Sequence, residues 1–279
     1  MSARSYIDST TTCYKEGTTY KAVRYDGVTI KQSTRAEDVI QAALNQKGVI
    51  HFAPQQPGQL TTWDCTSRIN SSTAFVLPER TYLTADAYNN IFITVPQGYS
   101  GKIIKIGQNV DVTSQGIDGI GFYERGSAQG NWTGIKFEMN GTKGIQFCEF
   151  SNITMYHNKV GIEMEVSGPD AWINSNTFQN IVIFSSEEAA YLFDLTGGGD
   201  LDFNTFIHCM VETGDQYGFK DVDGEANSFH NCQVWDSGSI VDMNIKATAD
   251  RTVIMGGRIG KDGTYTNLGT NTYKPVAAY

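Results

Sequence analysis

Short runs of alternating apolar and polar residues recur at nearly constant distances through the second half of the chain. The clearest runs are residues 135–139, 162–166, 192–195, 219–222 and 241–245. Such alternation is typical of a β-strand with one buried face and one face in contact with solvent. The pattern therefore predicts five strands whose apolar side chains point to a common core.

A second phrase, Phe followed two positions later by Asn or His, recurs between these strands. Its four copies begin at Phe150, Phe178, Phe206 and Phe229, and their third residues are Asn152, Asn180, His208 and Asn231. The copies are 28, 28 and 23 residues apart, which suits one coil of a solenoid and is too long for a hairpin. A side chain of this kind at one place in every coil fits a tight corner, where it hydrogen-bonds from coil to coil. We predict an all-β fold, a parallel β-helix.

The N-terminal part carries the one predicted helix. Residues 34–37 (Thr-Arg-Ala-Glu) have the sequence of a capping box, and Val39, Ile40, Ala43 and Leu44 then give one apolar helical face. A short α-helix is therefore expected to cap the open end of the solenoid. Three regions follow: a polar entry segment at 1–33, the β-helix with its capping helix at 34–260, and an irregular tail at 261–279.

Composition and charge narrow the class of protein. The 279 residues include 29 Gly, 14 Phe and 14 Tyr, a balance towards strands and turns. No run of about 18 apolar residues is present, so membrane insertion is not expected. The formal net charge is −9, and the region 187–242 has twelve carboxylates against one base, Lys220. This charge excludes nucleic acid as a partner and disfavours a strongly anionic polysaccharide unless cations intervene.

The cysteines and the N-terminal residues indicate in which cellular compartment the protein folds. Five cysteines give no disulfide framework, and Cys209 and Cys232 take the place of Ile in successive coils, which favours buried core residues. Pairing of Cys13 with Cys65 stays open, and no zinc-site spacing is present. The first residues lack the apolar stretch of a secretory signal. If Met1 is the native start, the expected location, a virion surface or the extracellular space, requires release from the cell.

One set of outward-facing positions in the alternating strands carries carboxylates. The set is Glu138, Glu165, Asp194, Asp221 and Asp242. Coils stacked about 4.8 Å apart would place these side chains in one column. Carboxylate pairs hydrolyse glycosidic bonds, and the same oxygens suit Ca²⁺, the one cofactor considered. Glu165, Asp194 and Asp221 are therefore the candidate catalytic residues; alternatively, the acids only keep an outer sheet soluble.

A second column is predicted just after the Asn corner. It contains Tyr156, Phe184, Glu212 and Trp235, with Tyr123 as a looser match one coil earlier. Exposed rings at coil spacing form flat platforms suited to the faces of sugars, so these five residues are the candidate substrate-binding set. Polar residues expected beside them are His157, Glu187, Glu188, Asp215 and Asp236. Alternatively, another subunit or the tail covers this column.

Several of these features together resemble a known superfamily. The Phe-x-Asn-Ile and Asn-x-Phe phrases, the helix at 35–46 and the strand followed by Pro at 76–82 resemble the pectin-lyase-like right-handed parallel β-helix proteins, including tailspike-like proteins of viruses. The likeness covers approximately residues 18–260. It implies a polysaccharide partner held on an outer groove, which favours the column of Glu165, Asp194 and Asp221. A tailspike-like protein would also be a homo-oligomer, a trimer.

The resemblance does not extend to a catalytic set. The Asn-x-Asp, Asp-Asp, Gly-His-Gly and Arg-x-Lys residues of polygalacturonases are missing, and residues 258–261 are only a poor echo of the last of these motifs. The arginine-rich pattern of pectate lyases is missing as well. Two functions stay open: a carbohydrate-directed surface protein that binds a polysaccharide, and is a hydrolase or lyase if it is an enzyme, or a non-catalytic structural β-helix of a virion or cell envelope.

Overall fold

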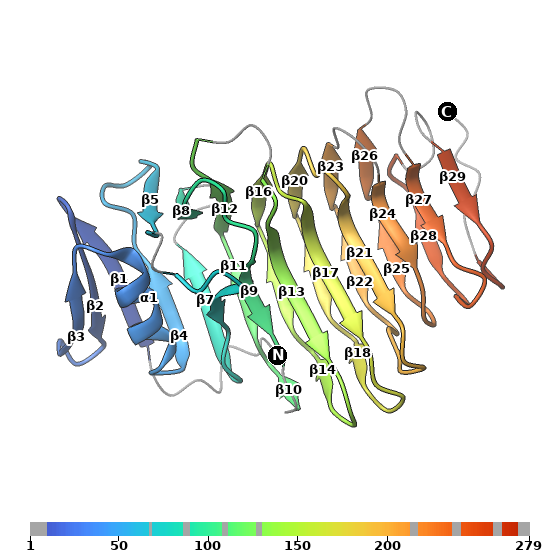
Figure 1. Cartoon of the computed structure of the whole chain (residues 1–279), viewed down its shortest axis with the longest axis horizontal. Helices are drawn as coiled ribbons and strands as arrows, with labels where there is room; N and C mark the ends of the chain where they lie inside the picture. The colour runs from blue at the N-terminus through green and yellow to red at the C-terminus, as the bar shows by residue number, and fades with distance from the viewer. Residues whose placement is uncertain are drawn as a thin grey trace.

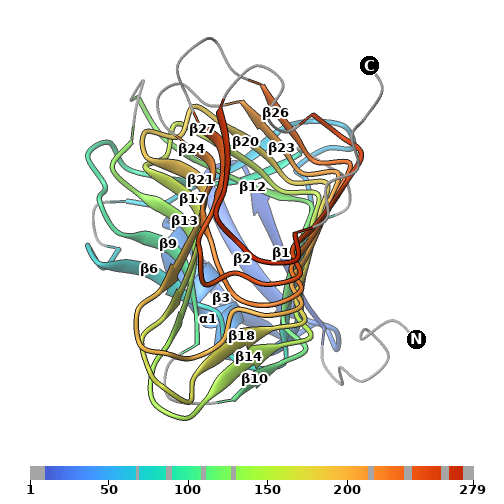
Figure 2. The same ribbon diagram turned by 90° about the vertical axis from the view of Figure 1, so that its right-hand side faces the viewer.

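Short parallel strands stack along one axis to build the protein. The computed structural model describes residues 10–66, 69–85, 90–107, 111–126, 130–212, 217–235, 241–258 and 264–272. Each regular coil contributes one strand to each of three main sheets, so a strand pairs with its counterparts in the coils before and after it. Viewed down the axis, successive coils superimpose around one core (Figure 2). The architecture is a right-handed parallel β-helix, and the predicted fold class is confirmed.

An eight-stranded sheet lies at the front of Figure 1. Its strands, in spatial order, are β29 (Thr264–Asn267), β27 (Val241–Ile245), β24 (Tyr217–Val222), β21 (Ala189–Leu195), β17 (Val160–Val166), β13 (Thr133–Met139), β9 (Lys102–Ile106) and β6 (Thr73–Val76). The five alternating runs predicted from the sequence lie within β13, β17, β21, β24 and β27. Strand β29 continues this sheet inside the predicted C-terminal tail.

Three further sheets complete the coils. The eleven-stranded sheet has the order β28 (Val253–Met255), β25 (Ser228–His230), β22 (Thr205–Ile207), β19 (Thr177–Gln179), β15 (Glu149–Ser151), β11 (Gly116–Asp118), β7 (Thr81–Ala85), β4 (Gly48–Phe52), β1 (Thr10–Glu16), β2 (Thr19–Arg24) and β3 (Thr29–Ser33). The seven-stranded sheet has the order β26 (Gln233–Trp235), β23 (Met210–Glu212), β20 (Val182–Phe184), β16 (Thr154–Tyr156), β12 (Ile120–Glu124), β8 (Ile91–Val95) and β5 (Thr61–Asp64). The small three-stranded sheet consists of β10 (Val112–Thr113), β14 (Gly144–Gln146) and β18 (Trp172–Asn174).

The repeated Phe residues form the centre of the core. Phe150, Phe178, Phe206 and Phe229 are fully buried. Their rings stack from coil to coil, with centroids 5.4 Å, 4.8 Å and 4.8 Å apart along the series. Burial of one such side chain contributes about 2–3 kcal/mol relative to exposure. The phrase that reveals the repeat in the sequence is therefore also the main packing unit of the solenoid.

The Asn or His that follows each Phe lies at the corner between the eleven- and seven-stranded sheets. All four residues have the left-handed backbone conformation, with φ of 51–54°, which Asn and His tolerate better than most residues. The Asn180 amide donates to Asn152 Oδ1 at 3.2 Å, and the amide of Asn231 contacts His208 Nε2 at 3.3 Å. The predicted corner ladder is confirmed, although His208 and Asn231 are exposed.

A second, buried ladder precedes the same strands and was not recognised in the sequence. Asn176, Asn204 and Asn227 are almost completely buried. The backbone N–H of Asn176 donates to Asn204 Oδ1 at 3.2 Å, and that of Asn204 donates to Asn227 Oδ1 at 2.9 Å. These amides satisfy backbone groups at a corner where no strand pairs with them, and buried backbone groups need such partners.

The N-terminal end of the solenoid is covered by β1–β3 and the one helix of the described residues, α1 (Ala36–Leu44) (Figure 1). The side chains predicted to form the apolar face of α1 are buried: Val39, Ile40, Ala43 and Leu44. The predicted capping box is wrong, because Arg35 is the N-cap residue and makes no side-chain cap. Glu37 instead accepts hydrogen bonds from the hydroxyl and the backbone N–H of Thr66.

Two further observations concern the cysteines and the length of the helix in the described residues. Cys13 and Cys65 are buried free thiols, and burial raises the pKa of both. Cys209 and Cys232 lie in the core, as predicted. Within the described residues, no helix has the length and apolar character needed to cross a membrane.

Candidate functional site

The candidate site is a row of side chains on the outer face of the seven-stranded sheet, here called the aromatic row. Its members are Tyr123, Tyr156, Phe184, Glu212 and Trp235. Strand pairing places them in consecutive steps: Tyr123 beside Tyr156, Tyr156 beside Phe184, Phe184 beside Glu212, and Glu212 beside Trp235. The structure thus brings together all five residues of the predicted substrate-binding set, and Tyr123 is in full register.

Two rings of the aromatic row stack on each other near its middle. Tyr156 and Phe184 are stacked, with ring centroids 4.9 Å apart and an angle of 5° between the planes. Tyr123 meets the edge of Phe92 at a centroid distance of 5.7 Å. Two parallel rings at this distance cover part of each other's faces, so they offer a sugar their outer edges and the uncovered parts of their faces.

Phe92 was not predicted as part of this surface, although Gly121 is a signal in the sequence that could have indicated it. Phe92 pairs with Gly121 in the next coil. A Cβ atom at Gly121 would lie 2.2 Å from Phe92 Cε1, so only glycine leaves space for this ring to lie across the strand. The ring reaches Tyr156 as well, at a centroid distance of 6.1 Å. Phe92 therefore joins rings of two coils into one surface.

A cavity of about 470 Å³ lies at this end of the aromatic row. Its walls are Leu60, Phe92, Tyr123, Tyr156 and His157. Leu60 is 60% exposed, whereas Phe92 is 6% exposed, so the cavity has a buried aromatic floor and an open apolar rim. Small-molecule sites commonly combine such walls with a few polar groups.

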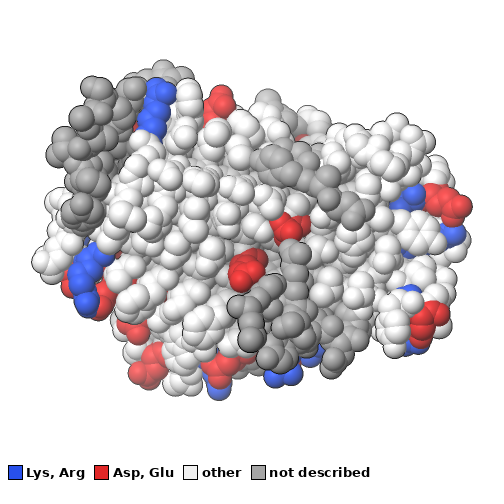
Figure 3. All heavy atoms as spheres, turned by 180° about the vertical axis from the view of Figure 1, so that it is seen from behind, with Lys and Arg blue, Asp and Glu red and all other residues white. Residues whose placement is uncertain are grey.

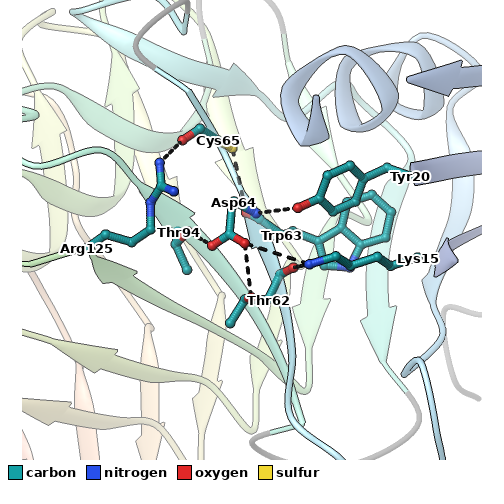
Figure 4. Close-up of polar contacts among 8 residues, drawn as sticks. All are labelled: Lys15, Tyr20, Thr62, Trp63, Asp64, Cys65, Thr94 and Arg125. Atoms are coloured by element: carbon teal, nitrogen blue, oxygen red, sulfur yellow. Dashed lines mark hydrogen bonds and ion pairs between the residues drawn. The ribbon is translucent and has the colours of Figure 1, made fainter. Parts of the chain in front are cut away.

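The row continues beyond Tyr123 into a polar cluster (Figure 4). Asp64 pairs with Thr94, and Thr94 pairs with Tyr123 in the next coil. Asp64 accepts hydrogen bonds from the Thr94 and Thr62 hydroxyls at 3.0 and 3.2 Å, and Lys15 Nζ lies 3.8 Å from its carboxylate. Burial, and then the charge of Asp64, raise the pKa of Tyr123. Tyr123 is therefore held as a neutral phenol, able to donate a hydrogen bond.

The other end of the row carries Glu212 and Trp235. Trp235 is 44% exposed, and its indole N–H donates to Gln233 at 3.1 Å. The guanidinium carbon of Arg258 lies 4.3 Å from the centre of its ring. Arg258 was not predicted as part of this surface. Asp215 and Asp236, which were expected nearby, lie outside the described residues.

The predicted carboxylate column on the eight-stranded sheet is correct over three coils. Glu138 pairs with Glu165, and Glu165 pairs with Asp194. The sequence did not predict a lysine among these acids. The ammonium group of Lys136 lies 2.8 Å from Glu163 and is also paired with Glu165. These hydrogen bonds raise the pKa of Lys136 against the opposing effect of burial. The acids therefore belong to a mixed ion-pair network.

The last two members of that column are placed differently from the prediction. Asp221 has a left-handed backbone, with φ of 57°, and the pairing of β24 with β27 shifts there. The Asp221 side chain accepts a hydrogen bond from Asn244 at 2.7 Å. Asp242 is completely buried, so its expected place on the outer face is wrong. Met243 pairs with Phe219, so Asp242 lies opposite Gly218 rather than beside Asp221, a register that spacing alone did not reveal.

The same network contains the one group of described residues with the spacing of a metal site. Oxygen atoms of Glu163, Glu165 and Asp194 lie within 4.8 Å of one another. Three carboxylates would suit Ca²⁺. The Lys136 ammonium already lies against two of them, and it supplies there the positive charge that a cation would bring. The residues thus fit a lysine-centred ion pair better than a calcium site.

A further acidic cluster gives a testable pH dependence. Burial and the negative charges of Asp200 and Asp223 raise the pKa of Asp202 to about 6. The folded protein therefore binds this proton more tightly than the unfolded chain, and stability falls as the pH rises from about 4 to about 6. The variant Asp202→Asn is expected to lose this decline and to melt at a higher temperature than the parent at pH 7. Melting temperatures from pH 4 to pH 8 test this, and equal curves would contradict it.

The face seen from behind differs from both columns. Much of it is free of Lys, Arg, Asp and Glu, although acidic groups appear near its middle as well as towards its edges (Figure 3). On the outer side of the eleven-stranded sheet, Thr177, Thr205 and Ser228 pair in consecutive coils. This surface has hydroxyl groups and no row of rings, so it is a weaker candidate for recognition of sugar faces.

Comparison with known proteins yields similarity of fold alone. No family model and no curated protein matches the sequence. The structure is similar to the ORF18 protein of Geobacillus virus E2, with 10% identity, a TM-score of 0.39, and coverage of 82% of this chain and 55% of that one. It is also similar to the A-modules of the mannuronan C-5 epimerases AlgE6 and AlgE4 of Azotobacter vinelandii. Identity is 12% for each, with TM-scores of 0.29 and 0.26 and coverage of 86% and 85% of this chain and 95% and 93% of those.

The strand pairing of the chain itself shows a parallel β-helix, the fold that the resemblance in the sequence implied. This chain spans about half the length of the viral protein. The sheets and corners that define the fold are visible in the strand pairing of the chain itself.

Proposed function

We propose that this protein binds a polysaccharide that lies along the solenoid axis on the aromatic row. The supporting observation is the stacked pair Tyr156 and Phe184, aligned with Tyr123 on one side and with Glu212 and Trp235 on the other. Adjacent coils are about 4.8 Å apart, close to the length that one hexopyranose adds to an extended glycan. A chain running along the axis can therefore place a sugar over successive side chains.

The same proposal extends to the location of the protein and to its assembly. A long solenoid with a glycan-binding face suits a virion surface or an extracellular location, and the polysaccharide would belong to a host or to the environment. Assembly into a homo-oligomer would multiply weak contacts with a repetitive polymer, because linked sites bind with higher avidity. A purely structural role would leave the cavity beside Tyr123 and Tyr156 without a ligand.

Cleavage of the glycan is a separate part of the proposal. Glu165 and Asp194 stand in adjacent coils, with carboxylate oxygens within 4.8 Å of each other, close to the separation of about 5 Å in retaining glycosidases. Lys136 neutralises Glu165, however, and the pair lies on a different sheet from the aromatic row. The geometry therefore supports binding better than hydrolysis. Incubation with capsular and cell-wall polysaccharides, followed for reducing ends and unsaturated uronates, tests for hydrolase or lyase activity.

Binding predicts a clear effect of removing the stacked rings. Tyr156→Ala and Phe184→Ala should each weaken binding to the recognised polysaccharide about tenfold, which corresponds to about 1.4 kcal/mol. Affinity electrophoresis through gels containing single polysaccharides measures this loss. The control is Tyr25→Ala, since Tyr25 is 75% exposed and lies outside the aromatic row, between β2 and β3. Full affinity in both ring variants, with unchanged melting temperatures, would contradict the proposal.

A further inference from the structure

Glu212 interrupts the aromatic row at a defined place. It pairs with Phe184 on one side and with Trp235 on the other, so its carboxylate stands one coil from each ring. The side chain is exposed, and within the described residues no base is paired with it. A sugar chain that follows the row from Phe184 to Trp235 must cross this carboxylate. Any charge on that part of the glycan is therefore felt at short range.

The bases closest to the row in the described structure are engaged with other groups. Arg125 donates to the Cys65 carbonyl at 2.6 Å, and Lys15 lies 3.8 Å from Asp64. Lys159 lies 3.6 Å from Glu188, and Arg258 covers the face of Trp235. Among the five members of the aromatic row, Glu212 is the one charged residue.

We infer that Glu212 makes the aromatic row selective for uncharged polysaccharides. The inference rests on the proposed function and names the substrate class of that same site. A carboxylate accepts strong, charge-assisted hydrogen bonds from sugar hydroxyls. The same group repels a carboxylate, sulfate or phosphate on the glycan. Specificity arises from this repulsion as much as from the attraction.

The size of the effect can be bounded from electrostatics. Two like charges about 5 Å apart in water repel with an energy that corresponds to about fourfold in affinity. Several charged sugars along the row multiply the effect. Salt screens it, because the Debye length falls from about 10 Å at 0.1 M to about 3 Å at 1 M. Discrimination by Glu212 should therefore be strongest at low ionic strength.

The experiment uses the whole chain and a matched pair of probes, polygalacturonate and its fully methyl-esterified form, beside a panel of neutral polysaccharides. Affinity electrophoresis at about 0.02 M and 1 M salt compares the parent with Glu212→Gln. We expect the parent to bind at least one neutral probe and to bind polygalacturonate more weakly than its ester. Glu212→Gln should raise the affinity for polygalacturonate at least about fourfold at low salt and lose affinity for the neutral probe. Glu149→Gln, which removes the same charge from the outer side of β15, should change neither.

The outcomes separate the inference from the proposed function. Equal or tighter binding of polygalacturonate by the parent would overturn the selectivity and leave glycan binding standing. An unchanged preference in Glu212→Gln, or the same change in Glu149→Gln, would overturn the role of Glu212. Failure of the parent to bind every polysaccharide in the panel would instead overturn the proposed function itself.

Discussion

Replacement of Asn204 by Ala is expected to lower the free energy of unfolding by about 3–5 kcal/mol, because three buried polar groups lose a partner at a cost of about 1–3 kcal/mol each. Asn204 Oδ1 accepts from both the backbone N–H and the side-chain amide of Asn176, at 3.2 and 3.0 Å. Its own amide donates to the Ile173 carbonyl at 2.8 Å. Chemical unfolding followed by circular dichroism measures the loss.

The matched control for this variant is Asn140→Ala. Asn140 is exposed, and substitutions at such surface positions change stability by less than about 0.5 kcal/mol. A second comparison is Asn231→Ala at the exposed corner ladder, which should cost less than Asn204→Ala because water replaces the lost contacts there. A loss below about 1 kcal/mol in Asn204→Ala would show that the buried ladder does not hold the coils in register.

The sequence contained the signal for this ladder without identifying its role. In three coils an Asn precedes the core Phe by two positions, as Asn204 precedes Phe206. The Asn or His after the Phe was taken as the ladder because the phrase that contains it recurs in four coils. Only burial separates the two sets, since side chains on both sides of a corner contact the next coil. Spacing identifies a corner, but it does not show which of its residues faces inward.

The aromatic row was predictable because β16, β20, β23 and β26 keep one register. The distance from the corner residue to the outward ring is the same in each coil, as from Asn180 to Phe184. The prediction of the carboxylate column is wrong where this constant spacing ends. Asp221 lies at a bulge, and in the shorter coil that follows Asp242 lies opposite Gly218, where its side chain is buried. Phe92 was missed because the earlier coils lack the repeated phrase that aligns the later ones.

Replacement of Lys136 by Met is expected to destabilise the protein by about 3 kcal/mol, because removal of one partner of a buried ion pair leaves charge without compensation. Lys136 is only 7% exposed, and its ammonium group is shared between Glu163 and Glu165. Met keeps most of the apolar volume, so the loss reports the charge. Thermal and chemical unfolding at pH 7 measure it.

The control is Lys143→Met, which breaks an exposed ion pair with Asp111, with both side chains more than 40% exposed; such pairs contribute about 0–1 kcal/mol. Without the Lys136 charge, the clustered carboxylates Glu163, Glu165 and Asp194 repel one another and hold protons more tightly in the folded state. The deficit of Lys136→Met should therefore shrink as the pH falls towards 4, and Ca²⁺ should also reduce it by supplying the missing charge. A deficit that is equal at pH 4 and pH 7 would mean that Lys136 acts through packing alone. A smaller deficit at pH 4 would instead show that Lys136 acts as the counter-charge of the carboxylates on this outer face.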